Sequence, residues 1–493
     1  MSTDEKTFFG HPRGLSTLFG TEMWERFSFY GLRAILVLFL TAPPVRNGLG
    51  LDETTAVPIV SLYGGLVYLT SLPGGWIADR LLGARRTVFW GGFIIMLGHI
   101  SMAIPVESPA TIWLGLILII CGTGLLKPNI SAMVGYLYRE QDDARRDSGF
   151  SLFYMGINLG ALIGIFVTPW LAGDSRWHLG FGAAAVGMAL GLIMYVARKR
   201  SLEGAGERVP HPLTPAERAK VTKLVVAAIV IAAALVAIWV ASGTFTVGTV
   251  PTVVTILSVV VVVLYFLYIM RGAHDITPAE RVGMRAYIWL FVAAAIFWMI
   301  FQQAAGALTV FAETKTDLTV FGVEIPAGMT QNFNALFVII LAPVFAEIWL
   351  KAGNRISSPL KFSFALLMAG LSFVVMWLLN GVAADGTKVA LLWLGLVYLM
   401  QTIGELCLSP VGLSVTAKLA PASLKGQMMG IWFLAPAVGD PIGGQAYRFL
   451  VPAVGEGGFF LTLGLLAVVA AAVLFAFVGK LKRLMGEHDS ALP

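Results

Sequence analysis

Charge and cysteine are both scarce in this chain of 493 residues. Charged residues make up 13% of the sequence, about half the share of a soluble domain, whereas hydrophobic residues make up 57%. The two cysteines, Cys121 and Cys407, lie in apolar runs, so they predict neither a disulfide framework nor a metal site. The six histidines form no acid–base constellation, which argues against a membrane-bound enzyme such as an acyltransferase. These shortages predict a polytopic membrane protein that is not an enzyme and needs no metal or cofactor.

Long apolar runs are the main feature of the sequence. Each of fourteen runs has roughly the 20 apolar residues that a bilayer-spanning helix needs. Lipid offers the backbone no hydrogen-bond partner, so such runs must be helices, and the predicted fold class is all-α. The polar N-terminus has no apolar signal-peptide core, so we expect the first helix to be retained. The predicted spans are 17–41, 55–78, 86–105, 110–137, 147–171, 178–197, 221–241, 248–270, 285–311, 329–350, 361–380, 389–417, 424–449 and 457–479.

Basic residues are distributed unevenly between the two sets of loops. Of the 34 basic residues, 26 lie in the termini or in the loops on the same side as the termini. The opposite loops hold only Arg46, Arg176, Lys315, Lys388 and Arg448. By the positive-inside rule, both termini are predicted to be cytoplasmic. The net charge of +6 then reflects orientation in the membrane, and we expect no nucleic-acid partner.

The order of spans suggests three parts. Residues 1–197 are predicted to form a six-helix bundle, 198–284 a cytoplasmic linker with two extra membrane helices, and 285–493 a second six-helix bundle. The linker begins with the polar stretch "RKRSLEGAGERVPHPLTPAERAK", which is rich in Pro and Gly. Apart from Lys223 at its cytoplasmic start, which is counted with the loop charges, the extra pair of spans contains no charged residue, so we expect the pair to be peripheral. Two six-helix halves resemble the architecture of the major facilitator transporters.

A loop motif after the second span strengthens that resemblance. The stretch "GGWIADRLLGARR" matches the superfamily pattern at a cytoplasmic turn. We expect it to act as a conformational latch, with Asp79 pairing with basic groups or with a helix N-terminus. The alternative is ordinary positive-inside charge. The latch residues are Asp79, Arg80, Gly83, Arg85 and Arg86.

The first span, "GTEMWERFSFYGLRAILVLFLTA", carries four ionisable groups. At about 100° per residue, Glu22, Arg26 and Arg33 share one narrow sector, with Glu25 beside it. Each charge near the bilayer centre costs about 3 kcal/mol on insertion scales, so we expect these groups to pair and to face a wet cavity. Protrusion of the first turns into the cytoplasm would explain Glu22 but not Arg33, which lies deeper in the span.

Other polar groups also lie within spans. Lys127 directly precedes Pro128 in the fourth span and needs a partner, for which Glu22 or Glu25 are candidates. In the fifth span a small-residue stripe formed by Gly156, Gly160 and Gly164 allows close helix contact. In the second half, Glu405 is interpreted as the one mid-span acid.

Four segments resemble signatures of one family, the proton-coupled oligopeptide transporters (POT family). They are "EMWERFSFYG", "LLKPNISAMVG", "FYMGINLGA" and "GELCLSPVGLS". The resemblance implies a monomeric symporter in the bacterial inner membrane that imports di- and tripeptides by alternating access, with protons as the coupling ion and the lipid bilayer as its surroundings. A carrier of another solute, such as nitrate or a glucoside, remains an alternative, as does a receptor that transports nothing.

The resemblance also implies roles for particular residues. Proton coupling would involve Glu22, Glu25, Arg26 and Lys127. Arg33 and Lys127 would attract the peptide carboxylate, and Glu405 would hold the peptide amino group, with Asn158 and Asn334 nearby. The remaining residues expected at the peptide site are Tyr30, Tyr68, Tyr154, Trp298, Gln302 and Trp432.

Three positions depart from the family pattern. Phe29 replaces a tyrosine, and Ser61 falls where mammalian members have a histidine. Gln302 stands where many bacterial members have a glutamate that pairs with the arginine at position 33. Because glutamine does not titrate, coupling is expected to depend on Glu22, Glu25 or a further acid, and Arg33 is expected to be freer for substrate.

Overall fold

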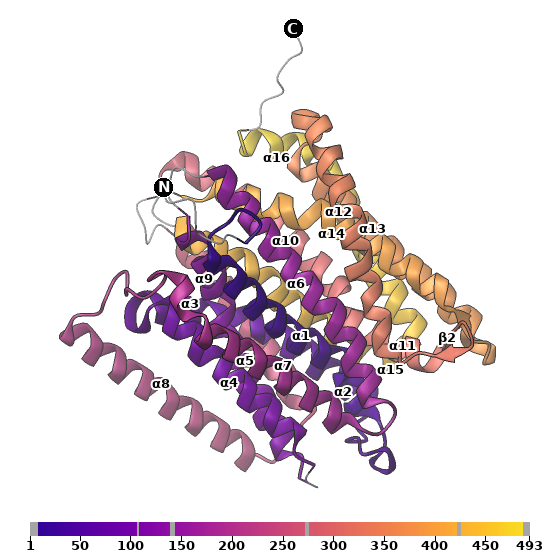
Figure 1. The fold of residues 1–493 in the computed structure, drawn as a ribbon. Coiled ribbons are helices and arrows are strands. Elements are labelled where there is room, and N and C mark those ends of the chain that lie inside the picture. Colours follow the sequence, from indigo (N-terminus) through magenta and orange to yellow (C-terminus); the bar gives the residue numbers. More distant parts are fainter. Residues whose placement is uncertain (1–7, 106–107, 139–142, 272–275, 422–424, 487–493) are drawn as a thin grey trace. The chain divides into compact units, whose positions relative to one another are not determined.

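The protein is almost entirely helical (Figure 1). The computed structural model describes residues 8–105, 108–138, 143–271, 276–421 and 425–486. Both chain termini lie outside these ranges, as do Lys6 and Arg139, two of the basic residues counted in the loops. Within the described ranges, every regular element apart from two short strand pairs is a helix, which confirms the predicted all-α class.

Nine α-helices and three shorter helical turns lie in the described residues up to residue 270. The α-helices are α1 (Arg13–Thr41), α2 (Glu53–Leu69), α3 (Ser71–Ile77), α4 (Ala84–Ala103), α5 (Ala110–Tyr136), α6 (Asp143–Ala172), α7 (Trp177–Ala197), α8 (Pro215–Ala241) and α9 (Thr249–Met270). The turns are η1 (Pro44–Arg46), η2 (Ala78–Leu82), which is a π-helix, and η3 (Lys199–Leu202).

The rest of the chain supplies the remaining helices and four two-residue strands. The helices are α10 (Pro278–Phe301), α11 (Ala307–Lys315), α12 (Asn332–Ala352), α13 (Ser358–Val382), α14 (Leu391–Leu419), α15 (Lys425–Ala476) and α16 (Val478–Leu484), with turns η4 (Gln302–Ala305), η5 (Ala327–Gln331), η6 (Gly353–Arg355) and η7 (Ala383–Asp385). Strand β1 (Thr316–Asp317) pairs in parallel with β4 (Val389–Ala390), and β2 (Thr319–Val320) pairs antiparallel with β3 (Val323–Glu324).

Each of the fourteen predicted spans falls on helical structure. By length and apolar composition, 11 helical segments of the described residues could cross a membrane. Two helices are not among these segments: α4, and α1, which carries the four ionisable groups. The last two predicted spans count as a single segment, because α15 joins them through a kink at Gly455. The predicted span 285–311 is interrupted, because α10 ends at Phe301 and η4 intervenes before α11. This break places Gln302 at a helix end.

The chain divides into two compact units by contact. The first comprises the described residues within Met1–Ser28, Thr70–Gly160 and Phe181–Val254. The second comprises those within Phe29–Leu69, Ala161–Gly180 and Thr255–Pro493. Four of the boundaries between the two units fall inside the helices α1, α6, α7 and α9. They differ from the divisions predicted after residues 197 and 284, and the three-part organisation stays a prediction. Helix α1 contributes its first half to one unit and its second half to the other.

Close helix contacts in both units depend on glycine. In the first unit, a Cβ added at Gly91 of α4 would lie 2.7 Å from the carbonyl oxygen of Gly122 in α5. In the second unit, a Cβ at Gly65 of α2 would lie 2.7 Å from the carbonyl oxygen of Ala437 in α15. Small residues let helix backbones approach closely where lipid supplies no hydrophobic driving force. These contacts bring the polar side chains of neighbouring helices within reach of one another.

Helices α8 and α9, which correspond to the two extra predicted spans, bury little of their surface. No residue of α8 is buried, and 28% of the most apolar window of α9 is buried. Helix α8 begins with a capping box, in which the Thr214 hydroxyl accepts a hydrogen bond from the Glu217 backbone and Glu217 accepts one from the Thr214 backbone. An apolar helix exposed all round is suited to lipid contact. This agrees with the expectation that the pair is peripheral.

Candidate functional site

The first unit holds a buried cluster of three charged side chains on α1. Glu22, Glu25 and Arg26 are each at most 2% exposed. The Arg26 Nε lies 3.1 Å from Glu22 Oε1 and also pairs with Glu25. Each glutamate has a second oxygen, Oε2 of Glu22 and Oε1 of Glu25, with no hydrogen-bond partner among the described residues. Two carboxylates therefore share one guanidinium in a buried site.

The helices around this cluster pack closely because α6 presents glycines to α1. A Cβ at Gly156 would lie 2.9 Å from the Phe19 ring, and one at Gly160 would lie 3.0 Å from the Arg26 Cβ. In the second unit, a Cβ at Gly31 of α1 would lie 3.2 Å from the carbonyl oxygen of Gly164. The predicted small-residue stripe thus lies along α1. Larger residues there would push α6 away from the ionic cluster.

Lys127 lies on α5, also in the first unit, and is half-buried. Its charge acts favourably on the Glu22 carboxylate, one of the two partners suggested by the sequence. Pro128 lacks the N–H of an ordinary helix residue, and the next residue, Asn129, donates from its side chain to the carbonyl oxygens of Leu125 at 2.7 Å and Gly74 at 3.1 Å. The amide of Asn129 therefore ties α5 to α3 beside Lys127.

The second unit contains a separate ionic site around Arg33. The Arg33 side chain, 5% exposed, donates from Nη1 to Gln302 Oε1 at 3.2 Å, and its Nη2 lies 3.5 Å from Asp440 Oδ2. The guanidinium also lies 5.8 Å from the centre of the Phe29 ring. A Cβ at Gly64 of α2 would lie 3.5 Å from Arg33 Nη2 and would contact Asp440, so glycine leaves room for the pair.

Asp440 is the functional candidate that sequence reasoning missed. It lies fully buried in α15, within "APAVGDPIGG", and the interpretation of Glu405 as the one mid-span acid of the second half was wrong. The signal was available, because an acid inside a predicted span is costly and marks a functional site. The expectation that Arg33 is freer for substrate was also wrong for this structure, since Asp440 holds it in an ion pair.

Glu405 and Asn334 meet in the second unit, as the sequence suggested for neighbouring residues of a site. The side-chain amide of Asn334 on α12 donates to Glu405 Oε2 on α14 at 3.0 Å, and to the Thr402 hydroxyl at 3.0 Å. Glu405 lies one helical turn after Thr402, so both groups face α12. The hydrogen bond from Asn334 fixes the Glu405 carboxylate without neutralising its charge, which leaves it suited to a cation.

The predicted aromatic residues of the second unit lie in different surroundings. Tyr30 contacts the Phe29 ring edge-on, with centroids 5.1 Å apart, and Tyr68 stacks on Phe433 with an interplanar angle of 11°. Trp298 packs against the rings on either side of it in α10, at 5.5 and 5.2 Å.

Trp432 is 4% exposed and packs against Gly412 and Phe362. Its ring therefore fills a helix contact in this structure, and its place at the peptide site stays a prediction.

Tyr154 and Asn158 belong to the first unit, as does Lys127. The Asn158 amide donates to the carbonyl oxygen of Tyr154 at 2.9 Å, one turn earlier in α6, and the Tyr154 side chain is 49% exposed. The other residues expected at the peptide site, namely Tyr30, Arg33, Tyr68, Trp298, Gln302, Asn334, Glu405 and Trp432, belong to the second unit. That all of these residues line one cavity stays a prediction.

The predicted latch residues lie in the first unit, covered by the segment that follows α7. Gly83 directly follows the π-helix η2, and its φ of 78° favours glycine. A Cβ there would lie 2.9 Å from the Glu207 carbonyl oxygen. Backbone hydrogen bonds join this turn to the following segment: Arg85 N donates to Gly206 O at 2.9 Å, and His211 N donates to Asp79 O at 3.0 Å. The segment is therefore docked on the motif.

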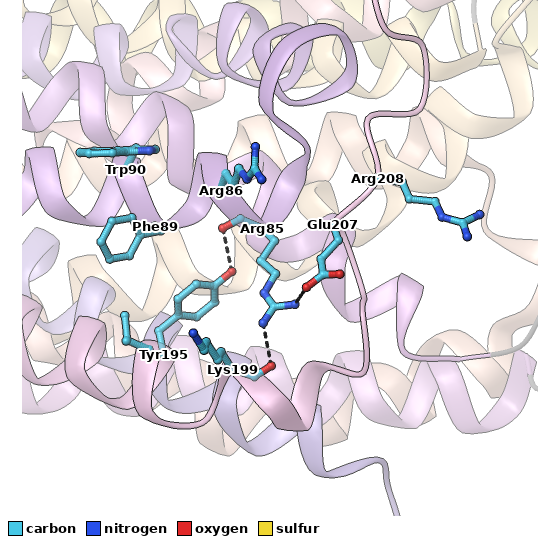
Figure 2. Close-up of a pocket in the computed structure, with 9 residues that line it drawn as sticks. Arg85, Arg86, Phe89, Trp90, Tyr195, Lys199, Glu207 and Arg208 are labelled. Carbon is cyan, nitrogen blue, oxygen red and sulfur yellow. Dashed lines mark hydrogen bonds and ion pairs between the residues drawn. The ribbon is translucent and has the colours of Figure 1, made fainter.

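Figure 2 shows the side chains of this contact. The Arg85 guanidinium pairs with Glu207 and donates to the Lys199 carbonyl oxygen at 2.9 Å, while the Tyr195 hydroxyl donates to the Arg85 carbonyl oxygen at 3.0 Å. Among the described residues Asp79 makes no ion pair, so the ionic contact of the motif belongs to Arg85. A cavity of about 700 Å³ adjoins it, lined by these residues and by Arg86, Phe89, Trp90, Val196 and Arg208.

Comparison with known proteins identifies the family. The model of the POT family matches residues 85–457. The uncharacterized transporter YclF of Bacillus subtilis (strain 168) is 46% identical over 486 residues, covering 98% of this chain and 97% of that protein. A di-/tripeptide transporter of Lactococcus lactis subsp. lactis (strain IL1403) is 41% identical, covering 99% of each chain.

A crystal structure of a peptide transporter POT in complex with sulfate matches with a TM-score of 0.93 and 48% identity, covering 98% of this chain and 97% of that chain. The resemblance drawn from the sequence is thereby confirmed, and with it the transporter fold. The chain belongs to the POT family and is an integral membrane transporter, not an enzyme.

Proposed function

We propose that this transporter imports di- and tripeptides together with protons by alternating access. The substrate class is supported by the relatives that carry this name and by a site chemistry suited to a zwitterion. Arg33 and Lys127 offer positive charge to the peptide carboxylate, and Glu405 offers negative charge to the peptide amino group. A carrier of peptides with varied side chains has to recognise the two termini, and charged groups of opposite sign do this over a distance.

One observation carries the coupling part of the proposal: the buried excess of acid around Arg26. Glu22 and Glu25 together bring two negative charges against one guanidinium, and each keeps one carboxylate oxygen without a hydrogen-bond partner among the described residues. A buried carboxylate next to a second carboxylate gains stability when one of the two binds a proton. The cluster can therefore accept a proton while Arg26 retains a carboxylate partner.

Lys127 connects this protonation to the substrate. While Glu22 is ionised it attracts the ammonium of Lys127. Once Glu22 is protonated that attraction is lost, and the ammonium is available to the carboxylate of a peptide. Inward movement of one net positive charge with each cycle would gain about 2.3 kcal/mol per 100 mV of membrane potential. Proton entry would thus drive accumulation of peptide.

The remaining parts of the proposal concern orientation and assembly. The loop charges favour cytoplasmic termini, and the family favours a place in the plasma membrane. One chain supplies all the residues that we assign to peptide and proton, so we propose that the monomer is the transporting form.

The experiment that tests the proposed function is uptake by proteoliposomes that contain the purified protein. Radiolabelled dialanine and trialanine should accumulate when the outside is more acidic, and a protonophore should abolish the accumulation. Unlabelled dialanine should compete, whereas nitrate or a glucoside should not. Uptake that only equilibrates across the membrane in the presence of a pH gradient would contradict proton coupling, and competition by nitrate or a glucoside alone would contradict the substrate class.

A further inference from the structure

The ion pair between Arg33 and Asp440 adds a second acid to the coupling scheme. We propose that Asp440 is a proton acceptor of the transport cycle, and that its protonation releases Arg33 for the carboxylate of the incoming peptide. This inference rests on the proposed function, because it assigns a further residue to proton-coupled peptide import. It concerns the second unit alone and does not depend on the cluster around Arg26.

The geometry of Arg33 gives it two unlike partners. Gln302 accepts a hydrogen bond from Nη1 at 3.2 Å, and Asp440 faces Nη2 at 3.5 Å. Gln302 is neutral at every pH, whereas Asp440 is the partner that can change its charge. Both oxygens of Asp440 lack a hydrogen-bond partner among the described residues, and the side chain is fully buried. The stability of the ionised form therefore depends mainly on Arg33.

The surroundings of Asp440 contain few other groups that could hold its charge. On the α2 side lie Gly64 and Ser61. The Ser61 hydroxyl accepts a hydrogen bond from Gln303 at 3.4 Å and also acts favourably on the Asp440 carboxylate, although less than Arg33 does. On the α10 side the preceding residue of α15, Gly439, packs against Ala295 and Met299, which are uncharged.

Arg33 is the one charged side chain found against Asp440 in the described part of the chain. The nearest acid along α2, Glu53, lies about two turns from Ser61 and accepts a hydrogen bond from Tyr447 at 3.0 Å.

The proton balance of the step is simple. A proton from the outer solution adds to a carboxylate oxygen of Asp440, which becomes a neutral acid. Arg33 keeps the hydrogen bond to Gln302 and has lost its counter-ion, so the site has a net charge of +1. A peptide carboxylate can replace the lost counter-ion. When the proton leaves toward the cytoplasm, Asp440 again pairs with Arg33 and competes with the peptide carboxylate, which favours peptide release.

A purely structural role is the competing explanation, in which the pair only holds α1 against α15. The two explanations differ in what an isosteric change should do. Asp440→Asn keeps the shape and a hydrogen-bond acceptor but cannot bind a proton. If the Arg33–Asp440 pair has only a structural role, proton-driven accumulation and peptide counterflow should decrease by the same factor. If Asp440 accepts a proton, only proton-driven accumulation should be lost, and exchange of peptide for peptide should persist.

The test compares three variants with the wild-type protein in proteoliposomes, using labelled dialanine. Accumulation is driven by an inward proton gradient, and counterflow is driven by unlabelled dialanine inside the vesicles. Asp440→Asn should equilibrate dialanine without accumulating it and should retain counterflow. The double variant Q302E/D440N moves the carboxylate to the opposite side of Arg33 and should regain accumulation. The matched control is Asp385→Asn, an exposed aspartate of the same unit, which should behave as wild type.

Each outcome decides the matter. If the wild-type protein accumulates dialanine and Asp440→Asn accumulates it equally well, the role of Asp440 is overturned and the proposed function stands. Absence of proton-driven accumulation by the wild type would overturn the proposed function and this inference with it. If Asp440→Asn loses counterflow as well, the double variant decides: recovery of accumulation supports the proposal, and failure to recover it overturns the proposal.

Discussion

Helix α1 carries two buried ionic sites, and they are built differently. In the first unit, Glu22, Glu25 and Arg26 all come from one helix, and these three side chains comprise two acids and one base. The half-buried Lys127 of α5 is a further positive charge that acts on Glu22. In the second unit, Arg33 pairs with Asp440 on α15, and the third member of the site, Gln302, is neutral. The first site can bind a proton and keep an ion pair. When the second site binds a proton, Arg33 loses the one carboxylate partner that it has among the described residues.

This difference suggests a division of tasks along the helix. A site with excess acid can store a proton at little cost to its own structure, because Arg26 still has a partner. A balanced pair responds to a proton by exposing an uncompensated guanidinium, which an anionic ligand can then neutralise. Both sites are therefore proposed to take up protons. The peptide carboxylate competes with Asp440 for Arg33 in the second unit, and with Glu22 for the ammonium of Lys127 in the first.

The largest effect is expected from breaking the Arg26 site. Arg26→Met should abolish transport of dialanine in both accumulation and counterflow assays, because it leaves two buried carboxylates facing each other. Removing one member of a buried ion pair costs about 3–5 kcal/mol, so the thermal stability of the purified protein should also fall. Arg33→Met leaves one unpaired carboxylate and should lower stability less. Equal losses of stability in the two variants would contradict the difference in acid count.

Lys127→Ala should produce the next largest effect. We expect it to abolish proton-driven accumulation of dialanine while leaving some peptide binding and counterflow, because Lys127 senses the charge of Glu22. The measurement is uptake with and without a pH gradient, with Lys127→Arg as the control that keeps the positive charge. Full accumulation by Lys127→Ala in an acid-outside gradient would remove this lysine from the coupling account.

Gln302→Glu sharpens the comparison by giving the second site the acid excess of the first. Two carboxylates would then share Arg33, and repulsion between them should let one of them bind a proton more easily. The pH at which uptake is fastest should therefore move upward, with Gln302→Met as the neutral control. A pH profile identical to that of the wild type would show that position 302 takes no part in coupling.

The smallest effect is expected at the cytoplasmic turn. The Arg85–Glu207 pair is partly exposed, with 16% and 58% of the two side chains accessible. Such pairs contribute about 0–1 kcal/mol, so Glu207→Gln should change the uptake rate by less than about fivefold. High salt should have a similar effect on the wild type and little effect on the variant. Complete loss of transport in Glu207→Gln would mean that this turn is far more important than its exposure suggests.

The two ionic sites also show what can be predicted from the sequence. The cluster around Arg26 was predictable, because its members lie three or four residues apart or adjacent on one helix, and helical periodicity places them together. The Arg33 site joins side chains separated by 269 and 407 positions in the chain, and no local pattern brings them together. Asp440 was visible as an acid in a span, but its partner depended on how α15 packs in the second unit.

The fold itself followed the apolar runs closely, since membrane helices are determined by composition and length. The break inside the predicted span 285–311 did not follow from composition: the turn η4, which places Gln302 at a helix end, lies within that span. The kink at Gly455 within α15 falls between the predicted spans 424–449 and 457–479, where the sequence predicted a loop. The docking of residues 199–213 on the turn at Gly83 was also not predictable, because a polar segment rich in Pro and Gly resembles a linker whether or not it packs.

Proton movement that accompanies peptide entry is the most direct test of the central claim. Proteoliposomes that contain the wild-type protein and an internal pH dye can be given dialanine outside, with no initial pH gradient and with the membrane potential negative inside. The account predicts acidification of the interior on addition of dialanine, and none in the Asp440→Asn variant. Entry of labelled dialanine into wild-type vesicles without any internal acidification would contradict it.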